Sequence, residues 1–280
     1  MRPLLAVDTP WLLYRAFHSL PKSIVGANGE PVGALLGCVD ALLGAAESCR
    51  PRAVAACFGA EEATHRVALY AGYHANREPM PQALRKQWDR APALLAAFGC
   101  TVETHVDLEA DDLLGSLAGV EARAGGETLL LTGDRDLYQA VGEATRVLKL
   151  RRGEAPQQIG PAKVEEQLGV GPDQIVDLIA LRGDPSDGLP GARGIGAKTA
   201  AALLAEHGTL EGVLAAAPKL RPRLAEALRE QAEELRCFQQ VAELVEVAVE
   251  RPVDRELDRA GGAAAARELG MVRLAQRLTG

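Results

Sequence analysis

The chain has 280 residues, of which 48% are hydrophobic and 25% charged, with a formal net charge of −7 at pH 7. This composition is typical of a folded globular protein and excludes a disordered or fibrous chain. No apolar run is long enough to cross a bilayer and the first residues lack a secretory pattern, so we expect a cytoplasmic, nucleoid-associated protein without a membrane partner. The net charge argues against a protein that coats nucleic acid with its whole surface, but it permits basic strips beside an acidic pocket.

The first part of the chain alternates short apolar runs with longer segments of helical spacing. The apolar runs predict strands, and the segments between them predict helices. Such alternation predicts an α/β fold with a mostly parallel central sheet flanked by helices. The predicted strands are 4–7, 53–58, 100–104, 128–132 and 146–150, and the predicted helices are 10–20, 33–48, 81–98 and 109–124.

From about residue 160 the strand signal ends and segments rich in alanine, leucine and glutamate follow. Two of them begin with a proline, which suits a first helical turn. We therefore predict an α/β core over 1–158 and an all-helical part over 159–280. The predicted helices of the second part are 161–168, 172–181, 197–206, 209–216 and 222–246, with weak short helices after 250.

Carboxylates follow the predicted strands and open the predicted helices. Ligands of parallel sheets bind beyond the carboxyl ends of the strands. Each acid alone has a structural explanation as a helix cap or a first-turn residue. Several at one sheet edge would repel one another and raise one another's pKa values. The acids are Asp8, Glu109, Asp111, Asp112, Asp134, Asp136, Asp184 and Asp187.

Divalent cations would relieve this repulsion. Oxygen ligands without histidine or cysteine select hard ions, Mg²⁺ or Mn²⁺, rather than zinc. Eight acids exceed the needs of one ion, whereas two ions can clamp the attacking and leaving oxygens of a phosphate. The pattern predicts two or more ions and metal-dependent hydrolysis of phosphodiesters.

Four motifs occur in a fixed order: Asp8 with Tyr14-Arg15-Ala16-Phe17, Glu109-Ala110-Asp111-Asp112, Thr132-Gly133-Asp134-Arg135-Asp136, and Gly183-Asp184-Pro185-Ser186-Asp187-Gly188-Leu189-Pro190-Gly191. Together they resemble the bacterial 5′ nucleases, that is, the flap endonucleases and the 5′→3′ exonuclease domain of DNA polymerase I. The resemblance covers roughly residues 4–245 and implies a PIN-like core whose eight acids share the metal ligation. Gly188 stands where many members have asparagine, as in the stand-alone actinobacterial branch, so we expect a free-standing, monomeric nuclease.

Two positions depart from the family pattern. Members place an aspartate ligand after the second strand, where this chain has Gly59, and a lysine where it has His74. The resemblance gives His74 and Arg77 the role of phosphate clamp, on one face of a helix. Histidine is mostly uncharged at neutral pH and is therefore a weaker clamp than lysine. We expect a Gly59→Asp variant to be more active at limiting Mg²⁺. Glu61 or Glu62 is a candidate substitute ligand in the natural chain, with ordinary solvent-exposed first-turn acids as the favoured alternative.

The segment Gly194-Ile195-Gly196-Ala197-Lys198-Thr199 lies between two predicted helices. Alanine stands at the lysine position of a P-loop, which argues against a nucleotide site. The segment resembles the helix-hairpin-helix of the same nucleases, here near 175–206. That resemblance implies non-specific duplex DNA binding with a monovalent cation such as K⁺. Gly194 and Gly196 would let the backbone approach a phosphate, and Lys198 and Thr199 would add contacts. A tight loop with packing glycines remains the alternative.

Basic residues recur near 66–98, where the resemblance places a helical arch that a single strand crosses. Arg66, Arg77, Arg85, Lys86 and Arg90 outnumber the acids of this stretch, and Pro79 and Pro81 predict a break between its two helices. Tyr14 and Arg15 are candidates to contact the terminal base or phosphate near Asp8, with a core position as the alternative for Tyr14. Trp11 and Trp88 are interpreted as packing residues.

The leading hypothesis is a structure-specific 5′ nuclease that acts on DNA flaps, overhangs, nicks and gaps in replication and repair. The Gly59 and His74 departures keep open a catalytically weakened paralogue that binds the same DNA. A ribonuclease of the related PIN type is a third hypothesis.

Overall fold

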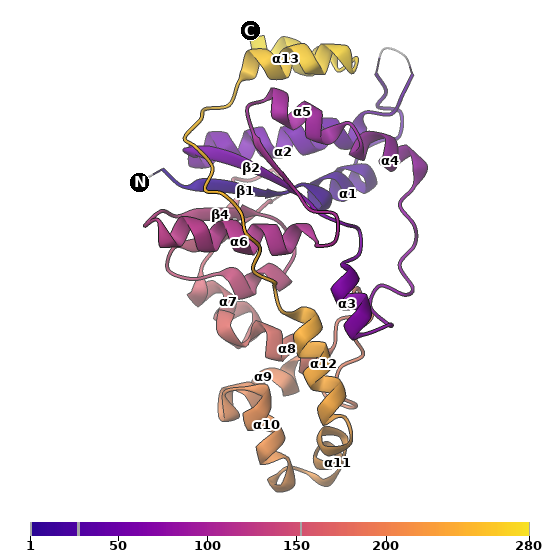
Figure 1. The fold of residues 1–280 in the computed structure, drawn as a ribbon, viewed down its shortest axis with the longest axis vertical. Helices are drawn as coiled ribbons and strands as arrows, with labels where there is room; N and C mark the ends of the chain where they lie inside the picture. The colour runs from indigo at the N-terminus through magenta and orange to yellow at the C-terminus, as the bar shows by residue number, and fades with distance from the viewer. Residues whose placement is uncertain (1, 27–28, 152, 280) are drawn as a thin grey trace.

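The structure is a computed structural model that describes residues 2–26, 29–151 and 153–279. Its α/β part occupies the upper half of Figure 1, and a group of helices extends below it. In the described ranges no helix is long and apolar enough to span a membrane.

The strands of the described residues form one six-stranded sheet of order β3-β2-β1-β4-β5-β6. All neighbouring strands run parallel except β5 and β6, which are antiparallel. The predicted fold class is confirmed, and β6 is a strand that the sequence analysis missed. The strands are β1 (Leu4–Asp8), β2 (Ala53–Phe58), β3 (Thr101–Thr104), β4 (Thr128–Leu131), β5 (Thr145–Lys149) and β6 (Gln157–Ile159).

Helices cover both faces of the sheet. Leu5 and Val7 of β1 face the layer of α1, α2, α4, α5, α13 and α14, whereas Leu4 and Ala6 face α6 and the helical part. All four side chains are fully buried, which explains why the strand has a continuous apolar run. The helices of the α/β part are α1 (Thr9–Ser19), α2 (Gly33–Cys49), α3 (Thr64–Leu69), α4 (Gln82–Trp88), α5 (Ala91–Ala97) and α6 (Ala110–Arg123), with a 3₁₀ turn at Asp136–Ala140.

The second part is helical, as predicted, but two long predicted helices, one in each part of the chain, are divided. The segment 81–98 forms α4 and α5, and 222–246 forms α11 and α12 with an end at Ala242. The helices are α7 (Pro161–Leu168), α8 (Ile175–Arg182), α9 (Ala197–His207), α10 (Leu210–Ala216), α11 (Pro222–Glu230), α12 (Ala232–Ala242), α13 (Arg259–Glu268) and α14 (Val272–Thr279), with 3₁₀ turns at Pro172–Gln174 and Ala217–Lys219.

The last helices do not belong to the helical part, in contrast to the predicted boundary. After α12 the chain runs back along α6, and α13 then packs beside α5 (Figure 1). The return segment 243–258 is tethered by Arg52, which is 5% exposed and pairs with buried Glu121. Arg52 also donates to the Pro252 carbonyl at 2.6 Å and to Asp254 at 2.7 Å. The weak apolar pattern after 250 does not indicate where these helices pack, because the surface that α13 and α14 contact lies on the distant helices α2 and α5.

The arch region is only partly helical. α3 ends at Leu69, turns follow, and residues 77–81 have no regular secondary structure before α4 begins. The long non-helical connection is visible at the right of Figure 1. The break therefore extends well before the two prolines that predicted it.

Leu274 of α14 tests the packing of the C-terminal helices on the α/β part, because it is 2% exposed within that apolar layer. We expect Leu274→Ala to lower the free energy of unfolding by about 2–5 kcal/mol. Val272→Ala, on the same helix but 51% exposed, should change it by less than about 0.5 kcal/mol. Chemical denaturation measures both, and equal effects would contradict the packing.

Candidate active site

A pocket of about 300 Å³ opens at the carboxyl edge of the sheet. Carboxylates reach it from β1, from the first turn of α6, from the segment after β4 and from the loop after α8. The structure thus brings together segments more than 100 residues apart in the sequence. Seven of the eight predicted acids line the pocket: Asp8, Glu109, Asp111, Asp134, Asp136, Asp184 and Asp187.

Asp8 is held by its place at the end of β1. One carboxylate oxygen caps α1 by accepting from the Trp11 N–H at 3.0 Å, and the other accepts from the Thr132 hydroxyl at 2.6 Å. Burial and the charge of Asp134 outweigh these hydrogen bonds and raise the pKa of Asp8 to about 7. The β1–α1 junction therefore holds an acid whose ionisation is unfavourable in the folded protein.

The pKa values of three neighbouring acids are also raised. Burial, followed by the charges of Asp8 and Asp134, raises the pKa of Asp111 well above its ordinary value. Burial and the charge of Asp134 do the same to the pKa of Asp136. The pKa of Asp134 is raised mainly by burial, against a hydrogen bond from the Asp136 N–H at 2.9 Å.

This donor set fits divalent ions of the hard class. It offers carboxylate oxygens only, dehydrated and mutually repelling, so a cation would relieve the energetic cost of ionising them. In the part of the chain that the structure describes, no three acidic, histidine or cysteine groups converge as a ready-made ion site. The acids accordingly line the walls of the pocket and do not meet at one point.

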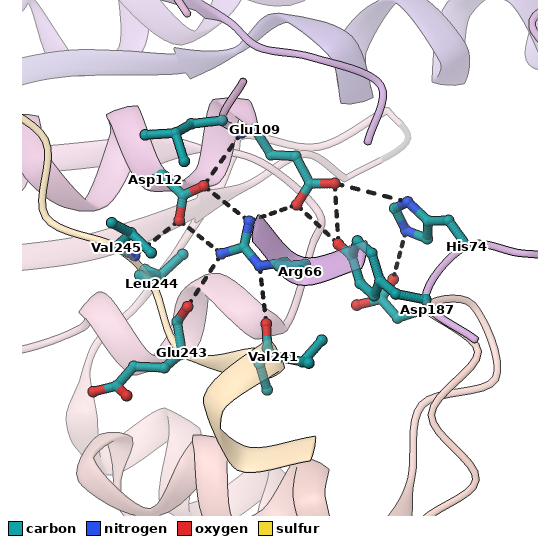
Figure 2. A network of polar contacts seen from close by, with 12 residues as sticks. Arg66, His74, Glu109, Asp112, Asp187, Val241, Glu243, Leu244 and Val245 are labelled. Carbon is teal, nitrogen blue, oxygen red and sulfur yellow. Dashed lines mark hydrogen bonds and ion pairs between the residues drawn. The ribbon is translucent and has the colours of Figure 1, made fainter. Parts of the chain in front are cut away.

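Asp112 is a correction to the predicted ligand set, because it lies outside the pocket and is fully buried. Both of its carboxylate oxygens accept from the Arg66 guanidinium, at 2.7 and 2.9 Å (Figure 2). They also accept from the backbone N–H groups of Glu109 and Val245. Asp112 thus anchors the N-terminus of α6, and Arg66, predicted as a DNA-facing residue of the arch, is 3% exposed and faces inward.

Glu109 stands between the pocket and this buried network. It accepts from Arg66 at 2.7 Å and from the Tyr73 hydroxyl at 2.8 Å, and His74 Nδ1 lies 3.7 Å away (Figure 2). Burial raises the pKa of Glu109, whereas Arg66 and Tyr73 act to lower it. Tyr73 had no assigned role in the sequence analysis.

His74 and Arg77 both line the pocket, but they do not share a helix face as predicted. His74 lies in a turn with φ 53°, and its N–H donates to the Asp187 carbonyl at 3.1 Å. Its ring Nε2 is 3.2 Å from the Asp187 carboxylate. Gly188 permits this docking, because its φ is +78° and a Cβ there would lie 2.3 Å from the Gly72 carbonyl oxygen.

Gly59 has no room for the aspartate of the family pattern. A Cβ at Gly59 would lie 2.4 Å from both the Ala110 nitrogen and the Glu109 carbonyl carbon. The expected gain from Gly59→Asp is therefore wrong on steric grounds: the α6 backbone occupies the space. Glu61 does line the pocket, where it pairs with Arg85, and its carbonyl accepts from Arg77 at 2.9 Å.

Aromatic side chains form the wall beside the acids. Trp11, Tyr14 and Trp88 line the pocket, and all three also pack against the apolar layer behind it, as expected for the two tryptophans. Trp88 contacts Tyr14 edge to face, and the Arg77 guanidinium lies 5.9 Å from the Tyr14 ring centroid. No spacing rule joins position 11 to position 88, and only the packing of α4 against α1 brings them together.

The remaining predicted DNA contacts lie outside the pocket lining. Arg15 lies 5.7 Å from the Trp11 ring centroid, Arg85 pairs with Glu61, and Lys86 pairs with Glu30 at 3.1 Å. Arg182, which the sequence analysis overlooked, lies 3.4 Å from Asp184 and 4.0 Å from Asp136. It directly precedes the Gly183-Asp184 motif, and this position was the one sequence signal that could have identified it.

The predicted hairpin joins α8 to α9. Gly196 precedes the first turn of α9 in extended conformation, and Gly194 has φ +78° with open space around it. Lys198 is exposed on the first turn. Gly194 and Thr199 line a second, open groove together with Arg193, Arg221 and Arg223.

Comparisons with known proteins cover nearly the whole chain. The family model for the 5′-3′ exonuclease N-terminal resolvase-like domain matches residues 3–169, and that for the 5′-3′ exonuclease C-terminal SAM fold matches residues 170–263.

Among similar proteins, a 5′-3′ exonuclease of Mycobacterium tuberculosis is 37% identical over 90% of this chain and 85% of its own length. The DNA polymerase I of Mycobacterium leprae is 38% identical over 81% of this chain, which spans only 25% of that relative. A solved T5 flap endonuclease, in a pseudo-enzyme-product complex with DNA and metal ions, has a TM-score of 0.72. It covers 99% of this chain and 98% of its own at 17% identity, which shows a shared fold.

The crowding at Gly59 predicts that even the single added carbon of an alanine side chain destabilises the folded protein. We expect Gly59→Ala to lower the free energy of unfolding by about 1–3 kcal/mol, because the new Cβ must push against backbone atoms. Gly44→Ala is the matched control: no atom lies within 4 Å of a Cβ at this position of α2, and a gain of about 0.4–1 kcal/mol is expected. Thermal unfolding of both variants measures this, and an undisturbed Gly59→Ala would contradict the steric argument.

Metal-free stability should depend on Asp8. Its pKa rises from 3.8 to about 7 on folding, so ionisation lowers folded-state stability progressively between about pH 4 and pH 7. Asp8→Asn keeps an oxygen for the Trp11 N–H but removes the charge. We expect the variant to be more stable than the wild type above pH 7 without divalent ions, by at most about 4 kcal/mol.

The same measurement carries its own controls. The advantage of Asp8→Asn should fall below about 1 kcal/mol near pH 4, where the carboxyl is protonated in the folded state and only about half ionised in the unfolded state. It should also shrink when Mg²⁺ is added. Melting temperatures across pH, with and without Mg²⁺, test this. A pH-independent difference would show that the charge is not responsible.

Proposed function

The chain belongs to the 5′-3′ exonuclease family, and from this we propose that it is a structure-specific 5′ nuclease that hydrolyses DNA phosphodiesters with divalent metal ions. The resemblance indicated by the sequence motifs is thereby confirmed at the level of the family. The observation that carries the finer proposal is the pocket in which seven carboxylates face His74 and Arg77. An anionic surface beside two basic side chains suits a phosphate that arrives with cations.

We assign metal binding to the seven acids of the pocket and exclude Asp112, which lies outside it. Asp8, Asp111, Asp134, Asp136, Asp184 and Asp187 line the pocket with Glu109 at its edge. Bound Mg²⁺ or Mn²⁺ would supply a nucleophile at neutral pH and would stabilise charge on the phosphate oxygens. Asp8, Asp111 and Asp136 would all gain from such ions, because their ionisation is opposed by burial and by neighbouring carboxylates.

The chain's own residues would orient the substrate. Arg77 can donate to a phosphate oxygen from the pocket rim, and its guanidinium already lies 3.3 Å from His74 Nδ1. His74 is fixed by Asp187 and can hold a proton at a ring nitrogen within the pocket. Trp11, Tyr14 and Trp88 offer apolar surface for the nucleotide and exclude water from that wall.

Duplex DNA would be held at a distance from the pocket. The α8–α9 hairpin presents Gly194, Gly196 and the exposed Lys198 to a phosphate backbone, with a monovalent cation such as K⁺ as a further contact. A 5′ flap, overhang, nick or gap has both a duplex for the hairpin and a free strand or end for the pocket. This arrangement favours such junctions over continuous duplex as substrates in replication and repair.

The test is cleavage of a 5′-labelled flap substrate with Mg²⁺, with Mn²⁺ and with chelator. We expect incision only with metal, and a fall in rate of about 100-fold or more for Asp111→Asn. Glu165→Gln, an exposed acid of α7, is the charge-matched control and should cleave like the wild type. Flap binding without incision in either metal would instead identify a protein whose catalysis has decayed.

A further inference from the structure

Arg66 is a buried cation whose hydrogen-bonding groups are all used. Its side chain donates to Val241 O at 2.9 Å, Glu109 Oε2 at 2.7 Å, Asp112 Oδ2 at 2.9 Å, Asp112 Oδ1 at 2.7 Å and Glu243 O at 3.1 Å. A guanidinium has five N–H donors, so these five bonds use its full capacity. Such saturation fixes the orientation of every partner group.

Arg66 and its partners come from three places in the chain. Arg66 lies on α3, at the entrance to the arch region, and Glu109 and Asp112 belong to the start of α6. Val241 and Glu243 are backbone acceptors at the C-terminal end of α12, where helix carbonyls lack partners within the helix. Figure 2 shows the guanidinium at the centre of these segments. One side chain therefore connects the pocket edge to the helical part.

Of these partners, only Glu109 also lines the pocket. Arg66 donates to Glu109 Oε2, and the Tyr73 hydroxyl lies within hydrogen-bond distance of both Glu109 carboxylate oxygens. The carboxylate therefore has little freedom to rotate. Asp112 adds to this by accepting from the Glu109 N–H at 3.2 Å and from the Val245 N–H at 2.9 Å. A shift at the end of α12 would thus be transmitted to the Glu109 carboxylate.

We propose that Arg66 is a positioning residue, which orients the Glu109 carboxylate toward divalent metal. Through its bonds to the Val241 and Glu243 carbonyls, it also couples that orientation to the position of the C-terminal end of α12. The inference rests on the proposed function, since it takes the pocket acids as metal ligands. Groups that orient a ligand from behind commonly account for 10–100-fold in metal affinity. Lysine at position 66 would keep the charge but offer three donors without the planar fork, and so could not hold all partners.

Arg52 provides a matched control. It is equally buried, pairs with Glu121 near the other end of α6 and holds the same return segment through Pro252 and Asp254. Within the described part of the chain, its side chain bonds to no residue of the pocket lining. Arg52→Lys should therefore weaken the attachment of the return segment to a similar degree without changing the orientation of Glu109.

The experiment is calorimetric titration of Mn²⁺ into DNA-free wild type, Arg66→Lys and Arg52→Lys. We expect Arg66→Lys to weaken Mn²⁺ binding about tenfold or more and Arg52→Lys to change it less than about twofold, while both lower the melting temperature. Equal weakening in the two variants would overturn the positioning role. A wild type that binds no divalent ion would instead overturn the proposed function, and this inference with it.

A second measurement requires no variant to fold. If the end of α12 affects metal binding at Glu109, metal binding must in turn stabilise the end of α12. Mn²⁺ should therefore slow amide hydrogen exchange in the wild type at Val245, whose N–H donates to Asp112. The Arg255 amide, which donates to the Arg52 carbonyl on the same return segment, should be unaffected. Unchanged protection at Val245, or equal protection at both amides, would contradict a connection through Arg66.

Discussion

Repulsion among carboxylates at one sheet edge is the constraint on which the rest of this structure depends. Burial, together with the charges of neighbouring carboxylates, raises the pKa values of Asp8, Asp111, Asp134 and Asp136, so their assembly opposes folding in the absence of cations. The opposing contribution comes from apolar packing on both faces of the strands that carry them. Hard cations, which the proposed function requires, would relieve the same repulsion.

The protein's own cations are arranged around this cluster. Arg66 contacts Glu109 and Asp112, and Arg182 contacts Asp184 and Asp136. Asp8 and Asp134, in contrast, are held by the Thr132 hydroxyl and by backbone N–H groups, which orient a carboxylate without neutralising it. Permanent charge thus stabilises the frame of the pocket, whereas neutral hydrogen-bond donors orient Asp8 and Asp134 in its interior.

Much of the fold and many of the site's members could be predicted from sequence. Continuous apolar runs such as Leu4-Leu5-Ala6-Val7 identify buried parallel strands, and parallel strands bring their carboxyl ends to one edge. Asp8 and Asp134, which follow two such strands, could therefore be assigned to the same edge. The errors have physical causes: Asp112 has the same local pattern as Asp111, yet its place on α6 turns it toward Arg66 and away from the pocket.

Local periodicity and composition by themselves determined the α/β class, the helical second part and an acid-rich edge, because these depend on neighbours within a few residues. Only the tertiary structure decided that Arg66 faces inward, that Gly59 has no space for a side chain and that α13 and α14 return to the α/β part. Each of these outcomes depends on atoms contributed by distant segments. The sequence gives the chemical type of each side chain, but residues from distant segments decide which groups that side chain contacts in the folded protein.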